Sequence, residues 1–331
     1  MCIRDRPPGT QTISTTRLTL PEDSRAWLER VDNGRVPLEH AHPSLILTTT
    51  FMQATFGTLV VLVFGHALDT VSLTLLAGIT ALAMNASLFH LGRPAYAWRA
   101  LKMWYRSWLS REVLCFGLFF GAIGMCTLAS WAGTLGFAVA GRLVLPCAYA
   151  AMFFGLCGTL ASAYIYLVKA RPSWNLVHTP LDFLLSAGLI GTSMAAAMKD
   201  PAEALVLLGN HFGLHLQAMP LVPAAWPATV FAMCWIANHL MRIGRLRASK
   251  NFEMRAAYNH MRGEALWWMV ALSMLSALAT PLFLSAPLPA LALATSIVAV
   301  AIGRYLFFVS VVPLSMGLTF LKHSPTHGAH A

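Results

Sequence analysis

The sequence predicts an all-α integral membrane protein, a polytopic bundle of eight transmembrane helices, and two observations support this fold class. Apolar residues make up 57% of the 331-residue chain, charged residues only 11%, and the mean hydropathy is +0.63. In addition, intervals without Asp, Glu, Lys or Arg repeatedly reach the roughly 20 residues that a helix needs to cross a bilayer. Soluble domains carry about 25% charged residues, so most of this chain belongs in lipid.

Charge-free intervals define the first five helices. Their boundaries fall at ionisable residues such as Glu39, Asp69 and Glu112. The predicted helices cover residues 43–66, 70–91, 113–132, 143–167 and 179–198.

Prolines decide the last three helices. The apolar stretch 204–241 is interrupted by glycines and prolines up to Pro227, so only 225–242 is predicted as a span, and 204–224 is expected to be interfacial or re-entrant. The run 264–304 is too long for one helix, and Pro281, Pro287 and Pro289 divide it into helices 264–284 and 290–316.

These helices form one membrane domain, residues 43–321, between two tails. The N-terminal tail, 1–42, is expected to contain one short amphipathic helix, and its first six residues look foreign to the rest of the chain. The C-terminal tail, 322–331, contains three histidines.

The distribution of Lys and Arg predicts the orientation. The connections after the second, fourth and sixth helices carry five, two and six of them, whereas the remaining four connections carry only Arg142 and Lys199. Basic residues accumulate on the cytoplasmic side of membrane proteins. Both termini are therefore predicted to be cytoplasmic, and the net charge of +10 needs no nucleic acid to explain it.

Neither metal nor haem is expected in this chain. The six cysteines lack the spacings of zinc or iron–sulfur sites, and most lie within predicted helices as small apolar residues. The twelve histidines lie mainly at helix ends, in loops and in tails, and no facing pair is visible. We therefore predict a helical bundle without haem.

The segment "SLFHLGRPAYAWRALKMWYRSWLSRE", residues 87–112, contains the main candidate site. Its cations and aromatic rings are typical of a cytoplasmic loop at the headgroups. His90 and Glu112, however, are predicted at the last turn of one helix and the first turn of the next, and hence at the same membrane depth. A histidine and a carboxylate at the boundary between lipid and water suit a quinone, whose two oxygens must be held and whose protons must be exchanged. The alternative for Glu112 is a carboxylate that complements the helix dipole.

Each of three further ionisable residues has two possible roles. Arg304 lies between apolar runs, where an arginine costs about 2.5–3.5 kcal/mol on insertion scales, so it is either part of the quinone site or a structural ion pair or backbone clamp. Arg93 is grouped with the quinone site, although a headgroup anchor is the simpler reading. Asp182 follows Pro180, and we expect it to cap a helix rather than to transfer protons.

Several motifs resemble one known family. These are "HPSLILTTTFMQATFG" from residue 42, "ASLFHLGRP" from 86, "SWLSREV" from 107, "SAYIYLVKARPSWN" from 162, "TPLDF" from 179 and "GRYLFF" from 303. Together they resemble the membrane-anchor subunit of dimethyl sulfoxide reductase-type molybdoenzymes, within the polysulfide reductase anchor superfamily.

The resemblance implies eight helices, no haem and a quinol site that includes His90 and Glu112. It also implies a bacterial inner membrane location, menaquinone or ubiquinone as the quinone, and two soluble partners. One partner is a four-cluster iron–sulfur subunit, and the other is a catalytic subunit with molybdopterin. The basic loops 93–111 and 242–263 and the N-terminal tail are the expected docking surface.

The sequence leaves the direction of electron flow and the partner's substrate open. Sulfite dehydrogenase-like anchors reduce quinone, whereas sulfoxide or N-oxide reductase-like anchors oxidise quinol. Two other classes of protein also stay open. A secondary transporter would use broken helices and polar residues near the midplane, for which Arg304 and the 204–224 segment are the support. A purely structural tether would have no quinone site.

Overall fold

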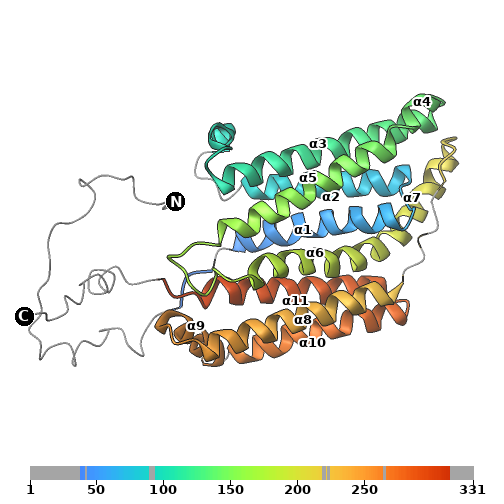
Figure 1. The fold of residues 1–331 in the computed structure, drawn as a ribbon. Helices are drawn as coiled ribbons and strands as arrows, with labels where there is room; N and C mark the ends of the chain where they lie inside the picture. Colours follow the sequence, from blue (N-terminus) through green and yellow to red (C-terminus); the bar gives the residue numbers. More distant parts are fainter. Residues whose placement is uncertain are drawn as a thin grey trace, which may run out of the picture.

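A computed structural model of the protein is built from helices joined by turns and loops (Figure 1). The structure describes residues 38–41, 43–88, 94–217, 221, 224–263 and 266–313, and no strand occurs among them. The predicted N-terminal helix and the C-terminal tail lie outside these residues. The long helices are α1 (Pro43–Phe64), α2 (Thr70–Leu88), α3 (Trp108–Thr134), α5 (Val144–Ile165), α6 (His178–Ala197), α8 (Ala225–Ala248), α10 (Leu266–Ser285) and α11 (Pro289–Val309).

Each of the eight predicted helices coincides with one of these long helices. Within the described ranges, six apolar helical stretches are long and apolar enough to cross a membrane, and they include α1, α3, α5, α6, α10 and α11. Helix α2 contributes a shorter apolar stretch, Thr70–Asn85. Helix α8 does not meet the criterion, because Asn238, His239 and Arg242 lower its hydropathy.

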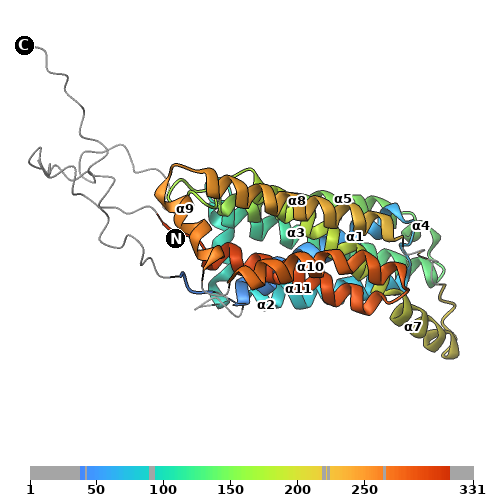
Figure 2. The same ribbon diagram turned by 90° about the horizontal axis from the view of Figure 1, so that it is seen from below.

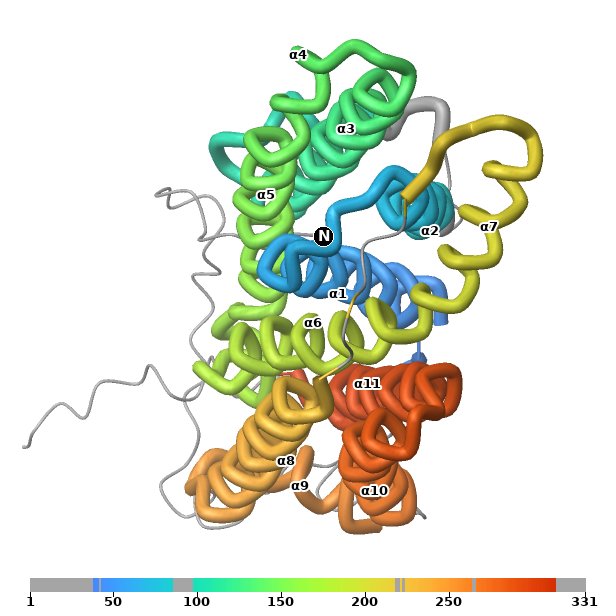
Figure 3. The backbone as a smooth tube through the Cα atoms, turned by 90° about the vertical axis from the view of Figure 1, so that its right-hand side faces the viewer, coloured from blue at the N-terminus to red at the C-terminus, as the bar shows by residue number. Residues whose placement is uncertain are grey.

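Two groups of four helices pack side by side. Helices α1, α2, α3 and α5 form the first group, and α6, α8, α10 and α11 form the second. Seen along the helices, α1 and α6 lie together in the middle of the molecule (Figure 3). The largest apolar core, which includes Leu59, Leu76, Ile123 and Ile190, extends across both groups.

The four short helices lie at the two ends of the bundle. The 3-10 helix η3 (Pro94–Met103) and α9 (Phe252–Arg262) lie at one end, and α4 (Ala138–Gly141) and α7 (Lys199–His211) lie at the other (Figures 1 and 2). We call the first end, which comprises η3, the connection 166–177 and the α8–α9 junction, the basic end. These are the connections in which Lys and Arg accumulate.

Several boundaries differ from the prediction. Helix α3 begins at Trp108 rather than at 113, so Glu112 is its fifth residue and not its first. Helix α8 continues through Arg242 to Ala248, and α9 occupies much of the predicted loop 242–263. Helix α11 ends at Val309, which places Arg304 close to a helix end rather than centrally.

Two glycines allow α1 and α6 to approach closely. A Cβ atom built on Gly57 would overlap the backbone of Ala187, and one built on Gly191 would overlap the backbone of Gly57. Helices in membranes associate largely through such close packing of small residues. The contact between the two four-helix groups therefore depends on the absence of side chains at these two positions.

We expect Gly57→Leu to prevent the two groups from packing, because the new side chain meets backbone rather than a movable side chain. Overpacking a close contact typically costs about 1–3 kcal/mol and more where backbone must shift. Gly78→Leu is the matched control, since nothing lies within 4 Å of a Cβ atom built there on α2. Protein extracted in mild detergent should lose its monodisperse elution with Gly57→Leu alone, and equal behaviour of the two variants would contradict the packing.

Candidate functional site

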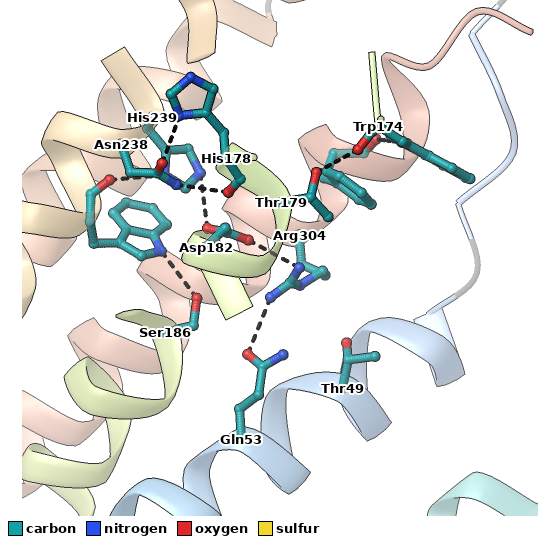
Figure 4. A network of polar contacts seen from close by, with 12 residues as sticks. Thr49, Gln53, Trp174, His178, Thr179, Asp182, Ser186, Asn238, His239 and Arg304 are labelled. Atoms are coloured by element: carbon teal, nitrogen blue, oxygen red, sulfur yellow. Dashed lines mark hydrogen bonds and ion pairs between the residues drawn. The ribbon is translucent and has the colours of Figure 1, made fainter. Parts of the chain in front are cut away.

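A buried ion pair joins two helices of the second group near the basic end. Arg304 on α11 places Nη1 3.0 Å from Oδ2 of Asp182 on α6 (Figure 4). Only 1% of Arg304 and 7% of Asp182 are exposed. Arg304 lies five residues before the end of α11 and Asp182 is the fifth residue of α6, so both are about one to two turns from the basic end.

Side chains from α1 and α8 extend this pair. Arg304 Nη2 donates to Oε1 of Gln53 at 3.2 Å. On the other side, His239 Nε2 lies 3.6 Å from Oδ1 of Asp182, while its Nδ1 lies 3.1 Å from the carbonyl oxygen of Trp235 (Figure 4). The pair therefore connects α1, α6, α8 and α11 through polar contacts.

A second arginine, Arg242, gives this region an excess of positive charge. Its side chain is 6% exposed, its Cζ lies 4.8 Å from the centre of the Phe307 ring, and its Nε and Nη2 make no hydrogen bond in the described part of the chain. We call Gln53, Asp182, His239, Arg242 and Arg304 the buried charge cluster. The cluster contains two guanidinium groups and one carboxylate, and an unbalanced buried charge is costly.

Unsatisfied polar atoms are concentrated in the cluster. Oδ1 of Asp182, Nε2 of Gln53 and Nε of Arg304 are buried without a hydrogen-bond partner among the described residues. Buried polar groups are normally hydrogen-bonded, so these atoms indicate a place for water or for a polar ligand.

Aromatic rings link the charged groups of the cluster to the end of α5. Arg304 Cζ lies 3.7 Å from the centre of the Phe183 ring. Tyr166, at the end of α5, packs against Phe183, Trp174, Phe307 and Phe308, with ring centres 5.3–5.8 Å apart. These rings are held against α11, because Trp174 Nε1 donates a hydrogen bond to the carbonyl oxygen of Phe307 at 2.7 Å.

Glu112 lies on α3, which packs along α5. Its carboxylate is half-buried and accepts a hydrogen bond from Ser162 on α5. Tyr166 follows Ser162 by four residues at the end of α5, and its ring packs against Phe183 and Phe307, the two rings that lie beside the Arg304 guanidinium group. The structure therefore brings Glu112 and Arg304, two of the four predicted site residues, to a common neighbour at the basic end.

The other two predicted residues, His90 and Arg93, lie outside the described residues. Arg304 forms an ion pair with Asp182, and both interpretations of its role, in a quinone site or as a structural ion pair, are compatible with that contact. Asp182 is not the expected cap, because it lies one turn inside α6 and pairs with that arginine.

Three residues of this region are missed by the sequence-based prediction. It assigns Arg242 to a cytoplasmic loop, His178 to a loop and His239 to a helix end. Instead, all three are buried within helices, and His178 Nδ1 lies 2.8 Å from Oδ1 of Asn238. The sequence does contain one signal for them. His239 and Arg242 are three residues apart, so on a helix they lie on the same face.

Chemically, the region combines hydrogen-bond donors, a carboxylate and excess positive charge near one end of the helix bundle. Such groups can hold electron-rich oxygens and exchange protons. No group of three His, Cys, Asp or Glu that could hold a metal ion occurs within the described ranges.

Comparisons with known proteins identify the family of the chain. Residues 42–309 match the family of DMSO reductase anchor subunits (DmsC). The chain is 30% identical over 196 residues to the C subunit of the sulfite dehydrogenase of Allochromatium vinosum, a match that covers 54% of this chain and 53% of that protein. It is 31% identical over 118 residues to anaerobic dimethyl sulfoxide reductase chain YnfH of Escherichia coli K12, which covers 36% of this chain and 40% of that protein.

The chain thus spans about half the length, or less, of the curated relatives that it matches. The family match is much longer and extends from the first residue before α1 to the last residue of α11. The resemblance noted in the sequence motifs is thereby confirmed, and this membrane protein belongs to the family of DMSO reductase anchor subunits.

Proposed function

We propose that this protein is the quinone-reactive membrane anchor of a molybdenum-dependent oxidoreductase complex. It would exchange electrons between quinone in the bilayer and an iron–sulfur subunit, which in turn serves a molybdopterin catalytic subunit. Family membership supports the anchor role. The convergence of Glu112, Tyr166 and the buried charge cluster at the basic end supports the quinone role, and it is the observation that carries the proposal.

The depth of these groups suits a lipid-soluble substrate that must exchange protons with water. Glu112 lies on α3 about 6 Å from its first residue, and the charges of Asp182 and Arg304 lie at similar depths on α6 and α11. A quinone ring could reach this level from the hydrocarbon while its protons pass to the basic end.

In this proposal Glu112 is the proton-exchanging group. When a quinol is oxidised, two electrons leave for the soluble partner and two protons must be accepted, one of them by the Glu112 carboxylate. When a quinone is reduced, the same carboxyl group donates. His90 and Arg93, from the connection between α2 and α3, would bind an oxygen of the ring, and Arg304 would favour electron-rich oxygens through its charge. Menaquinone and ubiquinone both fit this chemistry.

The partners and the location follow from the same proposal. We infer eight crossings of a bacterial cytoplasmic membrane, with the basic end and both termini in the cytoplasm. The iron–sulfur subunit would carry four clusters, and neither these clusters nor molybdopterin nor haem would be held by this chain. A sulfite dehydrogenase-like complex would reduce quinone, and a sulfoxide or N-oxide reductase-like complex would oxidise quinol.

Purification tests the anchor role against the two alternatives. Extracted from its native membrane in mild detergent, the protein should bring an iron–sulfur protein with it, and the reduced-minus-oxidised spectrum should lack the bands of haem b at stoichiometric intensity. A transporter would purify without an iron–sulfur partner, and a structural tether would bring the partner but give a complex without quinone-linked turnover. Stoichiometric haem b in this subunit would contradict the cofactor assignment.

A further inference from the structure

A polar cleft of about 600 Å³ opens at the basic end, apart from the buried charge cluster. It lies between the connection 166–177 and the α8–α9 junction. The side chains that determine its chemistry are Lys169, Asn175, Leu176, Arg245, Asn251 and Met254. This volume would hold a few residues of an extended peptide.

The rim of the cleft is positively charged and accessible. Lys169 and Arg245 are exposed, come from opposite walls, and make no ion pair within the described part of the chain. Arg247 and Lys250 are exposed nearby on the α8–α9 junction. The carboxylate of the lining, Glu253, is buried. The opening therefore favours a negatively charged ligand.

The rest of the lining resembles a peptide-binding site more than a phosphate site. Asn175 and Asn251 are exposed and offer amide donors and acceptors, which can pair with the N–H and C=O groups of a peptide backbone. Leu176 and Met254 are buried beneath them and provide an apolar floor. A flexible methionine adapts well to a partner's side chain. A lipid phosphate would use the cations but not the amide acceptors.

Helix α8 connects the cleft directly to the buried charge cluster. Arg245 lines the cleft, Arg242 lies one turn below it, and His239 lies about 9 Å from Arg245 along the helix. A protein seated in the cleft would therefore lie above the region where the proposed quinone chemistry takes place. That position suits a subunit that must exchange electrons with it.

We propose that this cleft is the docking site for an acidic peptide segment of the soluble iron–sulfur partner. Asp or Glu side chains of the segment pair with Lys169 and Arg245, its backbone pairs with Asn175 and Asn251, and one apolar side chain rests on Leu176 and Met254. The inference rests on the proposed function and narrows the expected docking surface from whole basic loops to one cleft.

The test reverses the charge of the rim in the full chain within its native membrane. We expect Lys169→Glu with Arg245→Glu to lower the amount of co-purified iron–sulfur protein at least about tenfold, because like charges then face each other. Arg255→Glu with Arg262→Glu makes the same change in charge on exposed residues of α9 outside the cleft, and it should lower the amount much less. Each variant removes two of the thirteen Lys and Arg residues at the basic end, and the eleven that remain still far outnumber the two on the opposite side, so both variants should insert normally.

A photo-reactive amino acid at Asn251 provides a direct readout. It should cross-link to a segment of the soluble partner that is rich in Asp and Glu, and the same group at Asn259, exposed on α9 outside the cleft, should not. Cross-linking only to phospholipid, or equal loss of partner in the two charge-reversal variants, would overturn the inference while leaving the proposed function intact. A wild-type protein that brings no iron–sulfur partner would instead overturn the proposed function, and this inference with it.

Discussion

Glu112→Gln should lower quinone-linked electron transfer by about two orders of magnitude or more while the complex stays assembled. Glutamine preserves the shape of the side chain and can still hydrogen-bond to Ser162, but it cannot accept a proton. Positioned acid–base groups typically contribute about 10²- to 10⁴-fold to a rate. Turnover should be measured in membranes with a quinol or quinone, and again with a dye that exchanges electrons with the soluble subunits directly.

The dye-linked rate is the internal control, because it bypasses this subunit and should remain normal. Glu203→Gln is the matched control variant, since Glu203 is an exposed carboxylate on α7 at the opposite end of the bundle. If Glu112 merely complemented the dipole of α3, its contribution would be about 0.3–1 kcal/mol of stability. That effect falls off within the first turn, and Glu112 is the fifth residue of the helix. A normal quinone-linked rate in Glu112→Gln would exclude the carboxylate from the reaction.

Asp182→Ala should destabilise the second helix group strongly. The substitution leaves the buried guanidinium groups of Arg304 and Arg242 without a carboxylate, and removing one partner of a buried ion pair costs about 3–5 kcal/mol. We expect little folded protein in the membrane and early aggregation on heating in detergent. The amount extracted and the aggregation temperature, compared with wild type, measure the effect.

The double variant Asp182→Leu with Arg304→Met separates stability from function. It removes one negative and one positive charge, so the net charge of the cluster stays as it is in wild type, and apolar replacement of a buried pair is often neutral or stabilising. We expect the double variant to regain the folded amount lost in Asp182→Ala but not quinone-linked turnover. Recovery of both would show that Asp182 and Arg304 act only as a structural ion pair.

The positions of the long helices were predictable, whereas several of their ends were not. Long apolar runs identify helices because lipid tolerates few charges, and that rule located the first five helices, whereas prolines within the later apolar runs were needed to locate the last three. The same rule ended the predicted sixth helix at Arg242, yet α8 continues to Ala248. Arg242 is buried against Phe307 inside the protein, where lipid-based reasoning about charges does not apply.

The candidate site could be predicted only in part, for a related reason. Glu112 was identified from its position beside a basic loop and from the family motif around it. The partner of Arg304 is 122 residues away in sequence, and a single sequence contains no spacing rule that joins Asp182 on α6 to it. Ionisable residues within or beside apolar runs were the available signal, and Asp182, His239 and Arg242 each satisfied it. Because these residues were interpreted as helix ends and caps, their position together in the buried charge cluster was not predicted.

Binding of a quinol-analogue inhibitor to the purified protein tests the central claim most directly, because it needs neither turnover nor the soluble partners. Titration of the wild-type protein in detergent should show saturable binding at one site. His90→Ala and Glu112→Gln should each weaken that binding about tenfold or more, since each removes a group that holds one end of the ring, while Glu203→Gln should bind as wild type does. Absence of saturable binding to the wild-type protein, or unchanged affinity in both His90→Ala and Glu112→Gln, would contradict a quinone site at the basic end.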